Sequence, residues 1–171
     1  RGVSGIIMRI DTKIAMWLAT GFGLGYAPVA SGTFGTLLGI PLALLMRDWP
    51  WWWQVLYCLV LALLAVWVCG IAEGVFGTKD DGRIVADEYV TFPICMIGML
   101  SFDGNPHYGA RDVAVVVGIM FIIHRILDII KPFPARRLQS LKGGLGIVID
   151  DVISSVYGLF LGQIALYLLL R

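Results

Sequence analysis

The fold of this chain is decided by residues 51–72, which read WWWQVLYCLVLALLAVWVCGIA. These 22 residues carry no charge, and about 20 apolar residues in a helix cross the hydrocarbon core of a bilayer. Three consecutive tryptophans open the stretch, and tryptophan favours the interface between membrane and water. We therefore expect a transmembrane helix from Trp51 to Ala72.

The whole chain has the composition of a membrane protein. Of its 171 residues, 58% are hydrophobic and 15% are charged, whereas soluble domains carry about 25% charged residues. This length predicts one domain over residues 1–171. The net charge of +1 gives no basic excess for binding nucleic acid. The three cysteines lie in apolar stretches without metal-ligand spacing, so we expect neither a disulfide nor zinc.

The N-terminal apolar run, residues 14–46, is uncharged but is interrupted by six glycines and by Pro28. We predict a shallow or re-entrant arm over Ile14–Tyr26 and an irregular loop over Ala27–Thr36. Leu37–Met46 then begins the first full crossing. Irregular backbone at membrane depth must be buried in protein or line a cavity.

Three further crossings are expected after residue 72. They cover Ile84–Phe102, Asp112–Ile130 and Ile147–Leu170, each apolar over most of its length. The sequence thus predicts an all-α membrane helical bundle with about five crossings and a broken or re-entrant N-terminal segment.

Acidic residues stand near the ends of three predicted helices, as Asp87-Glu88, Asp128 and Asp150-Asp151. With a cytoplasmic N-terminus, nine lysines and arginines fall on the cytoplasmic side and three on the other, which satisfies the positive-inside rule. That topology puts all three acidic groups at the cytoplasmic ends of their helices. Because a charge in hydrocarbon costs several kcal/mol unless it is paired or hydrated, we expect one shared functional site there.

The density of carboxylates in this predicted site suits a hard cation. Mg²⁺ binds through carboxylates and substrate phosphate, whereas softer metals need cysteine or histidine ligands. An alternative is that the acids only stabilise helix N-termini, at roughly 0.3–1 kcal/mol each. The predicted metal ligands and catalytic acids are Asp87, Glu88, Asp128, Asp150 and Asp151.

Basic residues accompany one of these acids. Arg125, Asp128 and Lys131 are spaced three apart, so they share one helical face, and Pro132 ends that helix. Two cations near the interface suit a phosphate group, which arginine binds through two parallel hydrogen bonds. The alternative is a ladder of ion pairs along the helix. We interpret the neighbouring His124 as a packing or hydrogen-bonding residue.

The glycine-rich stretch over residues 21–36 is a second candidate phosphate contact. Glycine lets backbone N–H groups approach an anion, and a helix N-terminus adds positive potential. We therefore assign Gly32 and Thr33 to phosphate binding. Small residues at this spacing are also common where membrane helices pack, and that alternative stays open.

Together these stretches resemble the phosphatidylglycerophosphatase A family. The matching residues, in chain order, are Pro28 with Ser31–Thr36, Ile84–Glu88, Phe121 with Arg125–Asp128, Lys131-Pro132 with Pro134, and Gly143–Asp151. The resemblance implies a Mg²⁺-dependent enzyme that hydrolyses phosphatidylglycerophosphate to phosphatidylglycerol and phosphate. It also implies that these acids bind the metal and take part in catalysis, and that the enzyme lies in the bacterial inner membrane. A phospholipid substrate is the only partner implied, with no protein partner.

A small cation- or proton-coupled transporter is the main alternative function. Broken helices and acids inside the membrane are also features of transporters. Transporter sites lie near the bilayer midplane, however, whereas these acids are expected near one interface. No inverted repeat is visible in the sequence.

Overall fold

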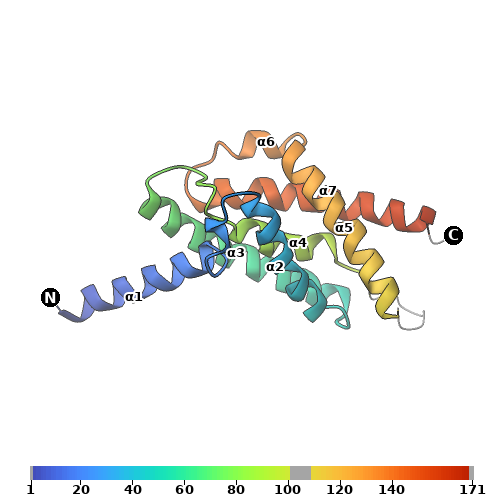
Figure 1. Cartoon of the computed structure of the whole chain (residues 1–171), viewed down its shortest axis with the longest axis horizontal. Coiled ribbons are helices and arrows are strands. Elements are labelled where there is room, and N and C mark those ends of the chain that lie inside the picture. Colours follow the sequence, from blue (N-terminus) through green and yellow to red (C-terminus); the bar gives the residue numbers. More distant parts are fainter. Residues whose placement is uncertain (1, 101–108, 170–171) are drawn as a thin grey trace.

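The computed structural model describes residues 2–100 and 109–169, and within these residues every regular element is helical (Figure 1). The prediction of an all-α fold is confirmed. The elements are α1 (Gly2–Ala19), η1 (Leu24–Tyr26), α2 (Ser31–Leu45), α3 (Trp51–Phe76), α4 (Ala86–Cys95), α5 (Ala110–Ile130), α6 (Ala135–Leu138) and α7 (Gly144–Leu169).

Within the described residues, three helices are long and apolar enough to cross a membrane, namely α3, α5 and α7. The helix predicted from Trp51 is confirmed and runs four residues past Ala72, to Phe76. Its outer face exposes Leu59, Leu63 and Trp67, which are 54%, 62% and 52% accessible. These side chains are four residues apart and form one apolar stripe, which faces lipid in a bilayer. The predicted count of about five crossings is not confirmed.

The N-terminal half differs from the prediction. The irregular loop expected over Ala27–Thr36 is wrong from Ser31 onward, because α2 already begins there. Within the predicted arm Ile14–Tyr26, the α-helix ends at Ala19, and the chain then turns through left-handed backbone at Gly21, Phe22 and Gly23 into η1.

Glycines in α2 explain this difference, because they form a packing surface and do not break the helix. A Cβ at Gly35 would lie 2.8 Å from a side-chain atom of Val85, and one at Gly39 would lie 2.8 Å from Phe92. The glycine face therefore lets α4 approach α2 closely, as small residues do between membrane helices.

Helix α4 replaces the third predicted crossing, and the expectation of one spanning helix over Ile84–Phe102 is wrong. It has ten residues, about 15 Å by helical rise, which is half of the roughly 30 Å hydrocarbon core. Pro93 lies inside it and Gly98 follows in a left-handed conformation; Phe102 lies outside the described residues. Eight of its ten residues are buried, and it contacts α1, α2, α3, α5 and α7.

A side chain of α3 accepts a hydrogen bond from the backbone that follows α4. The N–H of Gly98 donates to Gln54 Oε1 at 2.8 Å, and Gln54 Nε2 donates to the carbonyl of Trp49 at 2.8 Å. Gln54 is only 2% accessible. A buried backbone N–H needs a hydrogen-bond partner, and this amide supplies one where the short helix has ended.

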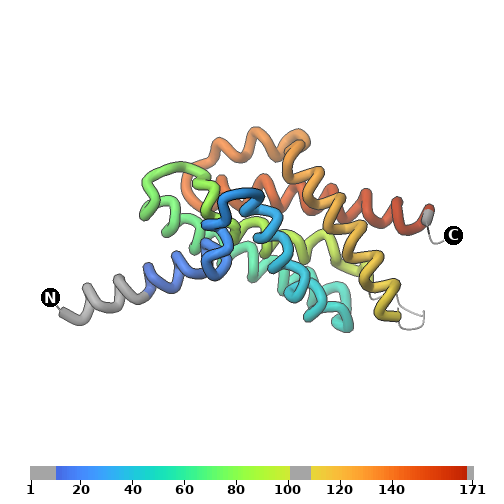
Figure 2. Tube along the Cα trace, viewed as in Figure 1, coloured from blue at the N-terminus to red at the C-terminus, as the bar shows by residue number. Residues whose placement is uncertain are grey.

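Helix α7 packs across both α3 and α5, and the crossing with α5 is visible in the chain trace (Figure 2). At the contact with α3, a Cβ on Gly144 would lie 1.9 Å from the carbonyl oxygen of Val66 and 2.6 Å from the nitrogen of Gly70. Backbone meets backbone at this point, so any side chain on Gly144 must push the two helices apart.

This contact predicts that Gly144→Ala destabilises the protein. We expect a loss of about 1–3 kcal/mol, the range of overpacked cores, in the free energy of unfolding measured by denaturant titration in detergent micelles. The matched control is Gly74→Ala on α3, where a Cβ meets nothing within 4 Å. The control should be neutral or gain up to about 1 kcal/mol of helix propensity. Equal effects of the two changes would contradict the close crossing.

Candidate functional site

The three acidic groups predicted from the sequence come together at one end of the bundle, where four helices meet. Asp87 and Glu88 lie in the first turn of α4, and Asp128 lies in the last turn of α5. Asp150 and Asp151 lie near the start of α7, which α5 crosses (Figure 1). The start of α2 closes the site.

Arg125 connects three of these helices through one nitrogen. Its Nη1 donates to Asp128 Oδ2 at 2.7 Å and to Thr36 Oγ1 at 3.3 Å, and lies 3.3 Å from Glu88 Oε1. The three charged side chains are 10–18% accessible, so these pairs are only weakly screened by water. Within the described residues, no hydrogen bond uses the other two guanidinium nitrogens, and these donors remain for a ligand.

Lys131 is the second cation and follows directly after α5. Its Nζ donates to Asp150 Oδ2 and lies 3.5 Å from Asp151 Oδ1. Both carboxylates are almost fully buried, at 0% and 1% accessible. Burial alone would lower the pKa of the Lys131 ammonium, but the charge of Asp151 and the hydrogen bond to Asp150 raise this pKa above its usual value. Lys131 is therefore charged in the folded protein.

The carboxylates also interact with one another across helices. Asp151 interacts electrostatically with Asp87 and Asp128, and Asp87 interacts with Glu88, Asp128 and Asp150. Five carboxylates thus face two cations, so a fully ionised site holds three negative charges without a counter-charge. Such an excess is unstable in a low-dielectric interior unless a proton or a further cation neutralises it.

Several carboxylate oxygens of this site are buried without a hydrogen-bond partner among the described residues. They are Asp87 Oδ1, Glu88 Oε2, Asp150 Oδ1 and Asp151 Oδ1. Among the residues described, no three His, Cys, Asp or Glu side chains already form a metal-binding group. Mg²⁺ commonly uses only one or two carboxylates and completes its shell with water and phosphate. The unpartnered hard oxygens therefore fit Mg²⁺.

The N-terminus of α2 holds the carboxylate of Glu88. A Cβ on Gly32 would lie 1.9 Å from Glu88 Oε1, and one on Gly35 would lie 2.6 Å from Oε2. A carboxylate is favoured at a helix N-terminus by the partial positive charge there. Gly32 thus contacts an acid of the site, while Thr33 is half-buried and makes no side-chain hydrogen bond within the described chain. Their phosphate-binding roles stay predictions.

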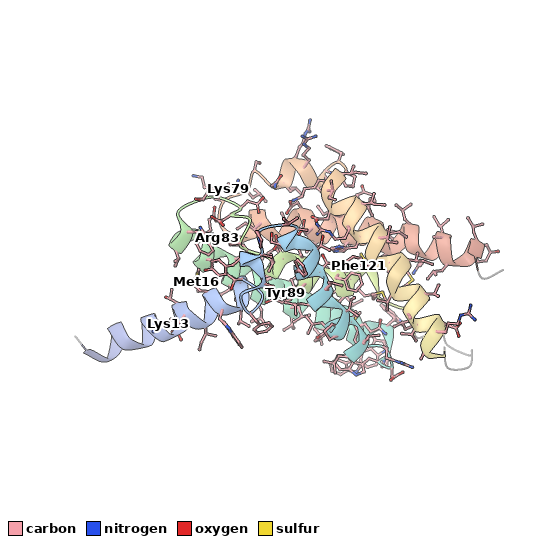
Figure 3. The ribbon with its side chains drawn as sticks, viewed as in Figure 1. Lys13, Met16, Lys79, Arg83, Tyr89 and Phe121 are labelled. Carbon is pink, nitrogen blue, oxygen red and sulfur yellow. The ribbon has the colours of Figure 1, made fainter. Side chains whose placement is uncertain are left out.

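The loop before α4 is fixed by an ion pair, which helps to place Asp87. Arg83 donates to both carboxylate oxygens of Asp81, at 2.7 and 2.8 Å, and these bonds lower the pKa of Asp81 to about 2. The same guanidinium lies 3.8 Å over the ring of Phe76. Arg83 and Lys79 both belong to this loop (Figure 3). Ser31 of α2 donates to the carbonyl of Gly82 at 2.9 Å, which ties the loop to the site.

His124 lies behind the acids, in the interior of the bundle. It is 1% accessible, packs edge-to-face on Phe92, and has Nε2 3.4 Å from Thr91 Oγ1. Thr91 in turn donates to the backbone carbonyl of Asp87 at 2.7 Å. These contacts agree with the packing and hydrogen-bonding interpretation of His124. Sequence reasoning missed Thr91 and Thr36, because their contacts depend on which helices are neighbours.

Comparisons with known proteins point to one family. The family model described as Phosphatidylglycerophosphatase A matches residues 17–166. Proteins named "Phosphatidylglycerophosphatase A" from Escherichia coli (strain K12) and Haemophilus influenzae are 36% and 33% identical; these matches cover 81% and 82% of this chain and 76% and 81% of those proteins. A "Putative phosphatidylinositol-3-phosphatase" from Bacteroides thetaiotaomicron is 32% identical, over 92% of this chain and 97% of its own length. No solved structure matches significantly.

The pairing of Lys131 predicts that Lys131→Met destabilises the protein in metal-free buffer, because two buried carboxylates lose their cation. We expect a loss of about 2 kcal/mol, less than the roughly 3–5 kcal/mol of fully buried pairs because Lys131 is 23% accessible. Unfolding by denaturant in micelles with EDTA measures it. Lys142→Met, at an exposed lysine, is the matched control. A loss no larger than that of the control would show that Lys131 does not neutralise this cluster.

Proposed function

The chain belongs to the phosphatidylglycerophosphatase A family, and on that basis we propose that it hydrolyses phosphatidylglycerophosphate to phosphatidylglycerol and phosphate. The proposal includes dependence on Mg²⁺ and a site at the cytoplasmic face of the bacterial inner membrane. One observation carries it: five carboxylates and two cations meet at one end of a membrane bundle. The phosphate of a bilayer lipid lies at such an end, near the interface.

Arg125 is the residue that we assign to the substrate phosphate. Its Nη1 is held by Asp128 and Glu88, which orients the planar guanidinium. The two remaining nitrogens are then directed donors for phosphate oxygens, in the parallel geometry that arginine offers. Donors that are fixed before the reaction stabilise charge that develops in the transition state. Lys131 adds a second positive charge on the side of α7.

The acids of α4, α5 and α7 are assigned to Mg²⁺, with Asp87, Glu88, Asp150 and Asp151 as the first candidates because each has a buried oxygen without a hydrogen bond among the described residues. Asp128 completes the set from which the ligands come. When bound, the ion supplies Lewis-acid polarisation of the phosphate and lowers the pKa of a coordinated water.

Hydrolysis also requires a proton acceptor. A water oxygen forms a bond to phosphorus, and the ester bond from phosphorus to the glycerol oxygen breaks. A carboxylate of the site that does not bind metal takes the proton of that water and returns it to the departing glycerol oxygen. Asp150 and Asp151 are at most 1% accessible, and such burial strengthens the charge interactions within the site.

The cytoplasmic orientation rests on the distribution of basic residues. Lys131, Arg136, Arg137 and Lys142 all lie in the segment between α5 and α7, and Lys131 pairs with the acids of α7. Loops rich in lysine and arginine stay in the cytoplasm during membrane insertion. The acids lie at the ends of α5 and α7 that this loop joins, which supports a cytoplasmic site.

The relative named for phosphatidylinositol 3-phosphate gives a second candidate substrate. Both lipids carry a phosphate monoester, so the site chemistry suits either one. Parallel phosphate-release assays with phosphatidylglycerophosphate and phosphatidylinositol 3-phosphate distinguish them by kcat/KM. We expect phosphatidylglycerophosphate to be the better substrate, and the reverse order would overturn the substrate assignment.

Removal of single carboxylates should abolish turnover. Asp128→Asn frees Arg125 from its partner, and Asp151→Asn removes a proposed ligand or base, so each should lower kcat by about 10²–10⁴-fold. Phosphate release from detergent-solubilised protein measures this, and EDTA should have a comparable effect that Mg²⁺ reverses. The control is Asp48→Asn, whose side chain is 81% accessible. Full activity in a folded Asp128→Asn or Asp151→Asn protein would refute the site.

The close contact between Gly32 and Glu88 predicts that a side chain at position 32 moves the Glu88 carboxylate and slows the reaction. The methyl group of Gly32→Ala displaces the carboxylate, and a displacement of about 1 Å can cost up to 100-fold in rate, so we expect kcat to fall about tenfold or more. Adding Glu88→Asp, which shortens the side chain, should restore part of the rate. Gly74→Ala is the control in open space. An unchanged kcat would show that the position of Glu88 does not matter.

A further inference from the structure

An apolar cavity lies beside the candidate site, on the other face of α4. Its volume is about 330 Å³ and its walls come from α1, α2, α3 and α4. The volume falls within the roughly 300–1,000 Å³ of small-molecule sites. Among its lining residues are Leu18, Leu38, Leu42, Leu61, Ala65 and Tyr89.

The one polar side chain among these is already satisfied. The hydroxyl of Tyr89 donates its one proton to the carbonyl of Leu18 at 3.0 Å, so it has no proton left to donate to a polar ligand. Apolar cavities do not retain ordered water. The cavity wall therefore favours a hydrocarbon ligand.

The rim of the cavity belongs to the outer apolar surface of the bundle. Phe22 and Leu64 line the cavity and are 49% and 52% accessible. Leu63, next to Leu64 on α3, is 62% accessible and belongs to the stripe that faces lipid. In a bilayer, hydrocarbon chains therefore surround the cavity mouth, and one of them can enter without crossing a polar surface.

The cavity and the acids lie on different sides of the start of α4. Ala86, Tyr89 and Val90 of α4 line the cavity, while Asp87 and Glu88 lie between them in sequence and belong to the acidic site. A phospholipid joins a phosphate headgroup to acyl chains through glycerol. A molecule with its phosphate at the acids therefore begins its chains beside this cavity.

We propose that this cavity binds one acyl chain of the phospholipid substrate and so places the phosphate monoester at the carboxylates. This inference rests on the function proposed above. The cavity should then affect KM and not kcat, because the acyl chain binds equally well in the ground state and in the transition state.

A cavity-filling substitution tests the assignment through kinetics. Leu42→Trp should raise KM for long-chain phosphatidylglycerophosphate about tenfold, the effect of losing about 1.4 kcal/mol of binding, with kcat unchanged. KM for the dihexanoyl lipid should change less than twofold, because short chains fill little of the cavity. Leu63→Trp, which adds the same ring to the lipid-facing stripe, is the control and should change neither KM. Should Leu42→Trp fail to fold, Leu64→Trp at the exposed rim replaces it.

A binding measurement without turnover provides the second readout. A phosphatidylglycerophosphate carrying a diazirine on one acyl chain is photolysed with the protein in micelles, and the labelled residues are mapped by mass spectrometry. We expect labels in residues 38–42 and 61–68, lost in Leu42→Trp and competed by unlabelled substrate. A phosphatidylethanolamine with the same diazirine chain should label the cavity far less.

The outcomes separate this inference from the function on which it rests. If the wild-type protein releases phosphate but Leu42→Trp leaves both KM values unchanged, the acyl-chain assignment is overturned. Equal cavity labelling by phosphatidylethanolamine, without competition by substrate, also overturns it and makes the cavity a site for bulk lipid. If the wild-type protein hydrolyses neither candidate lipid, the proposed function fails, while the labelling pattern still decides whether the cavity takes a chain.

Discussion

Charge neutralisation in a low-dielectric interior is the constraint on which this structure depends. Arg125 and Lys131 each hold carboxylates from other helices, and removing either cation would leave buried acids without a partner. The pairs therefore fix where α2, α4, α5 and α7 meet. They also leave more carboxylates than cations, and the Mg²⁺ site that we propose rests on this remaining negative charge.

The short helix α4 follows from the same constraint. Its first turn carries Asp87 and Glu88 to the charged end of the bundle, and its last turn stops inside, where Gln54 satisfies the backbone beyond it. Glycines of α2 allow it to lie close, with Glu88 against the start of that helix. One face of α4 thus presents acids and the other lines an apolar cavity, which matches the two halves of a phospholipid.

Sequence predicted the parts of this structure that depend on local composition. Predominantly apolar runs predicted α3, α5 and α7, and the positions of the acids within a membrane topology indicated that they would meet. The N-terminal half was harder, because glycine breaks a helix in one context and packs it in another, and only the neighbouring α4 shows which applies to Gly35 and Gly39. Pro93 and the left-handed Gly98 likewise ended α4 early. Thr36 contacts Arg125 and Thr91 contacts His124, and no sequence spacing reveals these tertiary contacts.

Anomalous diffraction from crystals grown in lipid with Mn²⁺, which takes the same oxygen ligands as Mg²⁺, tests whether the carboxylates of the three helices form one metal site. We expect one or more manganese peaks bounded by carboxylates of α4, α5 and α7, with Arg125 and Lys131 beside them. A structure with Asp87, Asp128 and Asp151 in separate places, or with manganese bound away from all three, would contradict this expectation.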